Sequence, residues 1–201
     1  MLTALKRFFL KLVVIDEFFA RRNAKFRMQH IKQWIPLGTV GMEIGVFKGV
    51  FSRVLLETVD PKELHLVDLW FLNGDWPWAS GSTCSAMGLE TTLRRVRHWS
   101  KKGVIRLSIC NDLEYLGGFE DDYFDWVYLD SSHQYEHTKD ELKMLRKKVA
   151  PGGIIAGDDW IEDEQHRHYG VCKAVREDVD SGWLQLLHAD IVSKQWVTKV
   201  L

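Results

Sequence analysis

Residues 40–49 read VGMEIGVFKG, a short apolar segment that ends in an acidic residue and continues into two spaced glycines. This pattern predicts a strand over Thr39–Ile44, a turn, and a helix over Phe51–Val59. Gly45 would let a ligand approach the backbone closely, and Gly49 would permit a tight entry into the helix. The turn is therefore predicted to bind a ligand at the carboxyl end of the first strand.

The spacing of this turn excludes two common phosphate-binding motifs. It is neither the G-x-G-x-x-G of dinucleotide-binding folds nor a Walker loop, because no Gly-Lys-Ser/Thr follows. Glu43 would also repel a phosphate group. A carboxylate at this position favours a ligand that carries an ammonium or sulfonium cation.

After this turn, short apolar segments continue to alternate with longer amphipathic ones, which is typical of βαβ crossovers. We predict an α/β fold, a Rossmann-like, doubly wound and mostly parallel seven-stranded sheet with helices on both faces. The other predicted strands are Glu63–Leu69, Val104–Ile109, Phe124–Asp130, Gly153–Gly157, Leu184–Leu187 and Ser193–Thr198, the last two forming a hairpin-like end to the sheet. The other predicted helices are Gly88–Lys101, Leu113–Gly117, Tyr135–Val149 and Tyr169–Asp180. The long segment Trp70–Met87 is expected to be a lid, its tryptophans lining the substrate together with Trp160.

The composition fits one globular domain, and it indicates neither a nucleic-acid-binding protein nor a disulfide-bonded one. The 201 residues are 46% hydrophobic, and the net charge of −1 gives no overall attraction to nucleic acid. Three widely spaced cysteines indicate neither a disulfide framework nor a zinc site. A cytoplasmic location is expected.

The near-neutral net charge hides a basic N-terminal segment. Residues 1–34 carry eight Lys/Arg and two Asp/Glu, so this segment has a charge of +6 and the other 167 residues carry −7. Its apolar spacing predicts an amphipathic helical segment, followed by a single domain over residues 35–201. The helix is too short in apolar residues to span a membrane. Packing on its own domain or on a second subunit of a homodimer is favoured, with an anionic membrane surface or an acidic partner as alternatives.

Polar residues at three successive strand ends predict a nucleoside site. In a doubly wound sheet, ligands bind at the carboxyl ends of the strands, where an acidic residue after the second strand can accept both ribose hydroxyls. An amide or carboxylate after the third strand could read the exocyclic amine of adenine. The predicted cofactor-binding residues are Glu43, Ile44, Gly45, Gly49, Asp68, Leu69, Asn111 and Asp112. The alternative for each strand end is an ordinary turn or helix cap.

Three aspartates are expected at the ends of the fourth and fifth strands. Asp130 ends one strand, and Asp158 and Asp159 end its neighbour. Each pair of carboxylates at about 4 Å would repel by roughly 4 kcal/mol, so protonation, spreading or a bound cation must relieve the repulsion. Oxygen ligands without cysteine favour a hard cation, Mg²⁺ before Mn²⁺ or Ca²⁺. The alternative is that Asp130 and Asp158 cap helices and Asp159 is solvated.

With these residues assembled, the chain resembles the class I S-adenosylmethionine-dependent methyltransferases. More narrowly, it is similar to metal-dependent O-methyltransferases related to macrocin O-methyltransferase. The resemblance runs from about Val40 to Trp160 and rests on EIGVFKG (43–49), Val67-Asp68, Tyr123-Phe124-Asp125, DSSHQYE (130–136), Asp140 and PGGIIAGDD (151–159). It implies that Glu43 and Gly45 hold the methionine portion, Asp68 the ribose and Asn111 or Asp112 the adenine. It further implies that Asp130, Asp158 and Asp159 bind a divalent cation that also takes a substrate hydroxyl.

The predicted function is methyl transfer from S-adenosylmethionine to a metal-coordinated hydroxyl of a small molecule, such as a sugar or natural product. Asp130 or His133 would accept the hydroxyl proton, and the cation is predicted to be Mg²⁺. One alternative is a nucleic-acid methyltransferase anchored by the basic N-terminus, although the acidic site disfavours nucleic acid as a partner. The other is a non-catalytic member of the fold that acts as a binding or scaffold protein.

Overall fold

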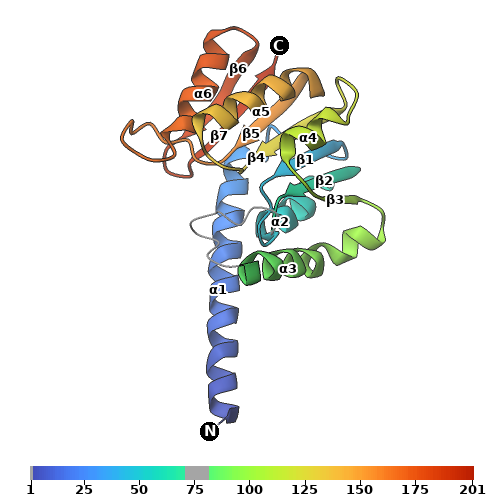
Figure 1. The fold of residues 1–201 in the computed structure, drawn as a ribbon, viewed down its shortest axis with the longest axis vertical. Coiled ribbons are helices and arrows are strands. Elements are labelled where there is room, and N and C mark those ends of the chain that lie inside the picture. Colours follow the sequence, from blue (N-terminus) through green and yellow to red (C-terminus); the bar gives the residue numbers. More distant parts are fainter. Residues whose placement is uncertain (1, 71–81) are drawn as a thin grey trace.

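The computed structural model describes the backbone of residues 2–70 and 82–201, and the side chains of residues 17–70 and 87–201. Its centre is a seven-stranded sheet in the order β3-β2-β1-β4-β5-β7-β6, with β7 antiparallel to both of its neighbours (Figure 1). The predicted fold class is confirmed. The strands are β1 (Val40–Ile44), β2 (Glu63–Asp68), β3 (Ile105–Ile109), β4 (Phe124–Leu129), β5 (Val149–Gly157), β6 (Leu184–Asp190) and β7 (Gln195–Val200).

Three helices cover each face of the sheet, because successive side chains of a strand point to opposite faces. On β4, Trp126 and Tyr128 pack towards α1, α2 and α3, whereas Val127 and Leu129 pack towards α4, α5 and α6. All four side chains are buried, which confirms that Trp126 fills the core. The helices are α1 (Leu2–Ile31), α2 (Val50–Val59), α3 (Ser82–Lys101), α4 (Asp112–Gly117), α5 (Tyr135–Lys148) and α6 (Tyr169–Asp180).

Parallel pairing brings the ends of β1, β4 and β5 to one edge of the sheet. Ile44 pairs with Leu129, and Leu129 pairs with Gly157. The next residue of each strand therefore lies close to its neighbours. A Cβ atom on Gly45 would lie only 1.9 Å from the backbone oxygen of Asp130, and Gly45 has φ 86°, so this contact between the two strand ends requires glycine.

The two largest differences from the predicted boundaries are at the starts of β5 and α3. The fifth strand begins at Val149 instead of Gly153, because the Pro-Gly-Gly sequence continues the strand with an irregularity in its pairing to β4. The segment predicted as an irregular lid already becomes helical at Ser82. The rest of that prediction, with Trp76 and Trp78, falls on residues 71–81, outside the described part of the chain.

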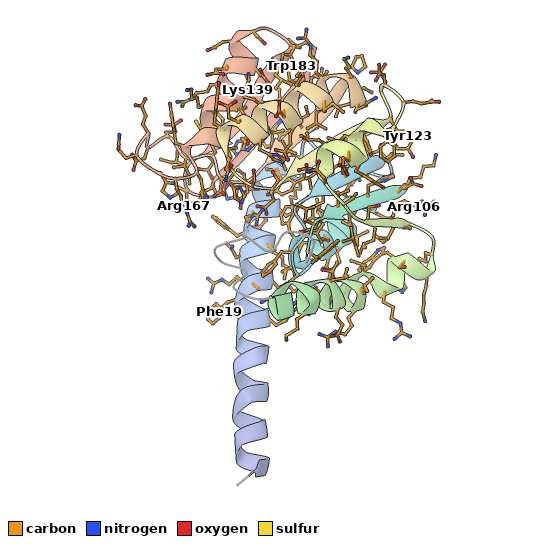
Figure 2. The ribbon with its side chains drawn as sticks, viewed as in Figure 1. Phe19, Arg106, Tyr123, Lys139, Arg167 and Trp183 are labelled. Atoms are coloured by element: carbon orange, nitrogen blue, oxygen red, sulfur yellow. The ribbon has the colours of Figure 1, made fainter. Side chains whose placement is uncertain are left out.

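The N-terminal segment is a long helix whose carboxyl-terminal half packs on the sheet domain. Ala24, Met28 and Ile31 are buried in the core against α2 and the sheet, and Arg21 pairs with Glu57 of α2 at 2.8 Å. Figure 1 shows the amino-terminal part of α1 projecting beyond the sheet and its covering helices. The side chain of Phe19 is 57% exposed on this helix (Figure 2).

None of the described helices combines the length and apolar character needed to cross a membrane.

Candidate functional site

The first strand end holds a buried carboxylate with an unpaired oxygen. Glu43 is 1% exposed, and its Oε2 atom makes no hydrogen bond to the protein. Burial raises the pKa of Glu43 to about 8. The adjacent turn is built as predicted, since Gly45 and Gly49 both have positive φ and Gly49 precedes α2. A bound cation at this strand end would provide Glu43 with the charge partner that it lacks.

The second strand end stabilises the turn. The carboxylate of Asp68 accepts hydrogen bonds from the backbone N–H groups of Val46 and Phe47 at 2.8 and 2.7 Å, and from Trp70 at 2.8 Å. Asp68 therefore holds the glycine turn against β2, and any ribose contact would share these oxygens. Ile44 contributes a core side chain that is 2% exposed, whereas Leu69 is half-buried after β2.

The two candidates after the third strand have different surroundings. Asn111 caps α4, its side-chain oxygen accepting from the backbone N–H groups of Leu113 and Glu114. Asp112 is 8% exposed, and its Oδ2 lies 2.8 Å from Nε2 of His137 on α5. Burial opposes ionisation of Asp112, but the hydrogen bond with His137 lowers its pKa. Asp112 is thus occupied by a protein partner, and Asn111 is the better candidate for adenine.

The carboxylates of Asp130 and Asp158 share a cation that the sequence analysis did not anticipate. Arg27 of α1 places Nη2 at 2.7 Å from Oδ2 of Asp130 and 3.1 Å from Oδ2 of Asp158. Its guanidinium also lies over the ring of Phe51, 4.5 Å from the centroid. The repulsion predicted between these carboxylates is relieved by a protein side chain.

Tyr128 and Gln195 complete a closed hydrogen-bond network around this guanidinium. Arg27 donates to the Tyr128 hydroxyl at 2.5 Å, and that hydroxyl donates to Oε1 of Gln195 at 2.7 Å. Gln195 in turn donates through Nε2 to Oδ1 of Asp158 at 2.6 Å. Burial lowers the pKa of Arg27, but the contacts with Tyr128, Asp130 and Asp158 hold it above the usual value. The guanidinium is therefore a permanent charge at this strand end.

Asp159 points to a different set of partners. Its Oδ2 lies 3.0 Å from Nδ1 of His133 and 2.8 Å from Nδ1 of His168, and the two imidazole rings are stacked. Burial opposes ionisation, but the two histidines lower the pKa of Asp159 to about 2. Nε2 of His133 lies 3.8 Å from Oδ1 of Asp130. His133 therefore lies between two of the predicted metal ligands.

The backbone at this cluster has an uncommon conformation. His133 has φ 59° and Asp159 has φ 60°, values in the left-handed region that is sparsely populated outside glycine. Each such residue stores roughly 1–3 kcal/mol of strain that the surrounding structure must hold. Conformations of this kind concentrate at functional sites, so the pair marks the ends of β4 and β5 as the candidate reaction centre.

The metal site predicted at the three aspartates stays a prediction, and the structure gives these side chains protein partners. The structure divides them between Arg27 and the two histidines, and of the three only Asp159 lies in a described group with metal-ligand geometry, that with His133 and His168. Asp130 and Asp158 cap no helix either. Trp70 and Trp160, predicted to line the substrate, are instead 4% and 2% exposed and pack in the two cores.

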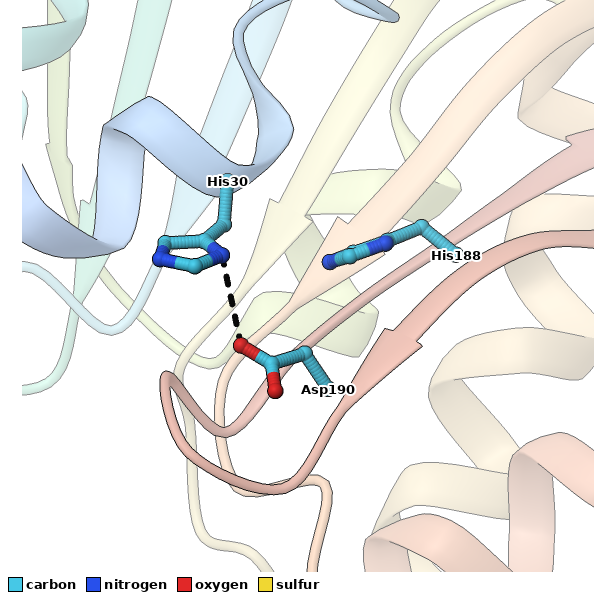
Figure 3. Close-up of side chains that lie close together, drawn as sticks. All are labelled: His30, His188 and Asp190. Carbon is cyan, nitrogen blue, oxygen red and sulfur yellow. Dashed lines mark ion pairs between the residues drawn. The ribbon is translucent and has the colours of Figure 1, made fainter.

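A second histidine cluster fixes the end of α1. Nδ1 of His30 pairs with Oδ2 of Asp190 at 3.2 Å, beside His188 of β6 (Figure 3). The ring of Trp34 stacks on His188 at 4.8 Å between centroids. These contacts anchor the helix one turn beyond Arg27 and help to hold the guanidinium in place.

Arg27, Tyr128, His168 and Gln195 were all missed by the sequence analysis. A signal existed for Arg27, because it occupies the same helix face as Ala24, Met28 and Ile31, where a charge needs a buried partner. Tyr128 and Gln195 lie in strands that also carry other polar residues, and nothing in their local pattern reveals their partners.

A family model described as a methyltransferase domain matches residues 42–160. The chain belongs to this methyltransferase family. The matched segment begins in β1 and ends just beyond Asp159, so it contains both the Glu43 turn and the aspartates. No curated protein matches the methyltransferase chain.

Solved structures show the same fold at low identity. An O-methyltransferase from Bacillus cereus in complex with SAH has a TM-score of 0.60 at 12% identity, with 90% of this chain and 80% of that chain covered. The O-methyltransferase TomG from Streptomyces achromogenes, in complex with SAM, gives 0.59 at 14% identity, with 90% and 79% covered. SAH-bound PaMTH1 from Podospora anserina gives 0.61 at 10% identity, with 89% and 77% covered. The methyltransferase therefore has the fold of S-adenosylmethionine-dependent O-methyltransferases, and the narrower macrocin-like resemblance stays a prediction.

Proposed function

We propose that this methyltransferase binds S-adenosylmethionine at the carboxyl ends of β1, β2 and β3 and methylates a hydroxyl group of a small molecule. The observation that carries the proposal is the unpaired Oε2 atom of Glu43, buried at the end of β1 beside the glycine turn. Ionisation of a buried carboxyl group without a charge partner is costly, which is why burial raises the pKa of Glu43. A ligand with an ammonium or sulfonium group would remove that cost.

Other residues of the turn suit the rest of the cofactor. Gly45 and Gly49 lack side chains where the backbone turns, Asp68 offers carboxylate oxygens for ribose, and Asn111 offers its amide for adenine. When bound, S-adenosylmethionine supplies an electrophilic methyl group on a sulfonium. The part of the protein that would face this methyl group is the neighbouring edge at Asp130 and His133.

For the proton transfer we propose His133 as the base and Asp159 as the residue that orients it. Asp130 is less suited to this role because its Oδ2 atom already accepts a hydrogen bond from Arg27. With its Nδ1–H donated to Asp159, a neutral His133 can take the acceptor proton on Nε2. The acceptor oxygen forms the new C–O bond as the C–S bond breaks, and that electron pair stays on sulfur.

Isothermal titration with S-adenosylhomocysteine tests the cofactor site. We expect binding, and at pH 7 we expect it to release protons, because a bound ammonium favours the ionised form of Glu43. Proton release appears as a dependence of the heat on the ionisation enthalpy of the buffer. Glu43→Gln should weaken binding and abolish this release, whereas Glu57→Gln on the exposed side of α2 should do neither. No binding at millimolar ligand would contradict the proposal.

A nucleic-acid methyltransferase is the second candidate function. Its support is a basic groove on α2 and α3, lined by Arg53, Arg94, Arg95, Arg97, His98, Trp99 and Lys101. Several of these cations already pair with acidic residues, Arg53 with Glu57 and Arg95 with Glu17. Retention of RNA or DNA that falls steeply with salt would favour this candidate, and no retention at low salt would exclude it.

Dimerisation through α1 remains a prediction.

A further inference from the structure

We propose that Arg27 takes the place of the divalent cation in this methyltransferase, so that the site at Asp130 and Asp158 is complete without metal. The inference deepens the proposed function, on which its catalytic meaning rests, but metal binding at the site can be measured independently. It starts from the disagreement between the metal ligands that the sequence predicts and the partners that the structure gives them.

The guanidinium of Arg27 occupies the position that a bridging cation would need. One nitrogen of Arg27 lies 2.7 Å from Asp130 and 3.1 Å from Asp158, so it sits between the two carboxylates that a bridging cation would need. A dehydrated Mg²⁺ ion requires ligand oxygens at about 2.0–2.1 Å in octahedral geometry. Oxygen atoms turned towards Arg27 cannot also meet around such an ion while the guanidinium remains there.

The other polar groups around the two carboxylates form hydrogen bonds that suit the guanidinium and not a metal ion. The other oxygen of Asp158 accepts from Gln195 at 2.6 Å, and Gln195 is fully buried. The Tyr128 hydroxyl, also buried, contacts both Arg27 and Gln195. This network already provides neighbours for the carboxylates, and it fixes their orientation towards the helix.

The charge of Arg27 partly balances the charges of Asp130 and Asp158. Two carboxylates against one guanidinium leave a net charge of −1 around Arg27, whereas Asp159 faces imidazole nitrogens of His133 and His168. The guanidinium offsets the repulsion between Asp130 and Asp158 without a metal, and a permanently charged arginine cannot be removed by a chelator.

The anchorage of α1 makes the arrangement durable. Ala24, Met28 and Ile31 bury the same helix face that carries Arg27, and Arg21 and His30 form ion pairs on either side of it. An outward shift of α1 away from the two aspartates would therefore break apolar packing as well as ion pairs.

Binding of Mn²⁺, a hard cation with an electron-paramagnetic signal, tests the inference in the full-length protein. Because other histidine and carboxylate clusters have metal-ligand geometry, the relevant quantity is the Mn²⁺ binding that Asp158→Asn abolishes. We expect none of it in the wild-type protein. We expect Arg27→Ala to gain one such Mn²⁺ site, which Arg27→Ala/Asp158→Asn loses again, while Arg27→Lys and the control Arg21→Ala gain none.

Two results would overturn the inference. One is Mn²⁺ binding by the wild-type protein that Asp158→Asn abolishes, which would show that the helix yields to a resident metal. The other is a folded Arg27→Ala protein, verified by circular dichroism, that gains no site. If Arg27→Ala does not fold, the wild-type measurement decides alone. Titration of S-adenosylhomocysteine in EDTA is run in parallel, so that loss of cofactor binding is seen as a failure of the proposed function.

Discussion

The two edges of the candidate site differ in whether their buried carboxyl groups have partners within the protein. At the end of β1, Glu43 is buried with an unpaired oxygen and a pKa raised to about 8. At the ends of β4 and β5, Asp130, Asp158 and Asp159 all have cationic or titratable partners within the protein. A buried carboxyl group with an unpaired oxygen is suited to a ligand that brings a cation and favours its ionised form, whereas a paired cluster is preorganised. We therefore expect the end of β1 to bind a cationic group of the ligand. The ends of β4 and β5 provide an electrostatic field that the protein's own charges fix in place.

Substitution of Arg27 removes the cation from the ends of β4 and β5, and it should have the largest effect on the free energy of unfolding. Arg27→Ala leaves two largely buried carboxylates facing one another, and breaking a buried ion pair costs about 3–5 kcal/mol. Urea denaturation measures the free energy of unfolding. Asp158→Asn in the Arg27→Ala background should recover part of the loss, because it removes one of the orphaned charges.

The control for this prediction is Arg21→Ala, six residues earlier on the same helix. Arg21 pairs with Glu57 at the surface, where an ion pair contributes about 0–1 kcal/mol. Equal losses in both variants would mean that the network around Arg27 contributes no more than a surface ion pair.

Substituting Gly45 disturbs the contact that joins the two edges. Gly45→Ala places a methyl group 1.9 Å from the Asp130 backbone oxygen and forces a side chain into positive φ. We expect a loss of about 2–4 kcal/mol, because overpacking and left-handed strain add. Gly38→Ala is the matched control, since Gly38 also has positive φ but nothing lies within 4 Å of the added atom. If both variants lose the same stability, the close approach of the strand ends is not the cause.

The pH dependence of stability tests the unpaired edge. Since the pKa of Glu43 is raised from 4.5 to about 8 in the folded protein, the folded state binds the extra proton between these values. Its contribution to stability is therefore present at low pH and decreases as pH rises through this window. Glu43→Gln should remove about 1–3 kcal/mol of the decline between pH 5 and pH 8. Denaturation at several pH values gives this slope, and an unchanged slope would show that Glu43 is not the buried acid responsible.

The same contrast explains what the sequence could and could not predict. The mostly parallel seven-stranded α/β fold and the turn at Gly45 follow from local patterns, namely alternating apolar and amphipathic segments and glycine spacing, and these predictions are confirmed. The closeness of Asp130 to Asp158 also follows, because adjacent parallel strands end together. Arg27 lies outside this logic, since its partners are 103 and 131 positions away and depend on how α1 docks.

A similar limit applies to single residues whose role depends on packing. Trp70 and Trp160 were expected to line the substrate because they stand at strand ends, but both pack in the core. A residue's place along the chain fixes which edge of the sheet it is near. It does not fix which way the side chain turns, because that choice depends on the volume left by neighbouring elements.

The smallest expected effect separates the two roles of Asn111. Asn111→Ala removes the cap of α4 and should cost about 1 kcal/mol. Asn111→Ser preserves a capping oxygen and should keep the cap, but it removes the amide that would face adenine. If Asn111 contacts the cofactor, S-adenosylhomocysteine binding measured by titration should weaken in both variants, although only the alanine variant loses stability. If it is a cap alone, Asn111→Ser should bind as tightly as the wild-type protein, and the cofactor contacts would then not extend to the end of β3.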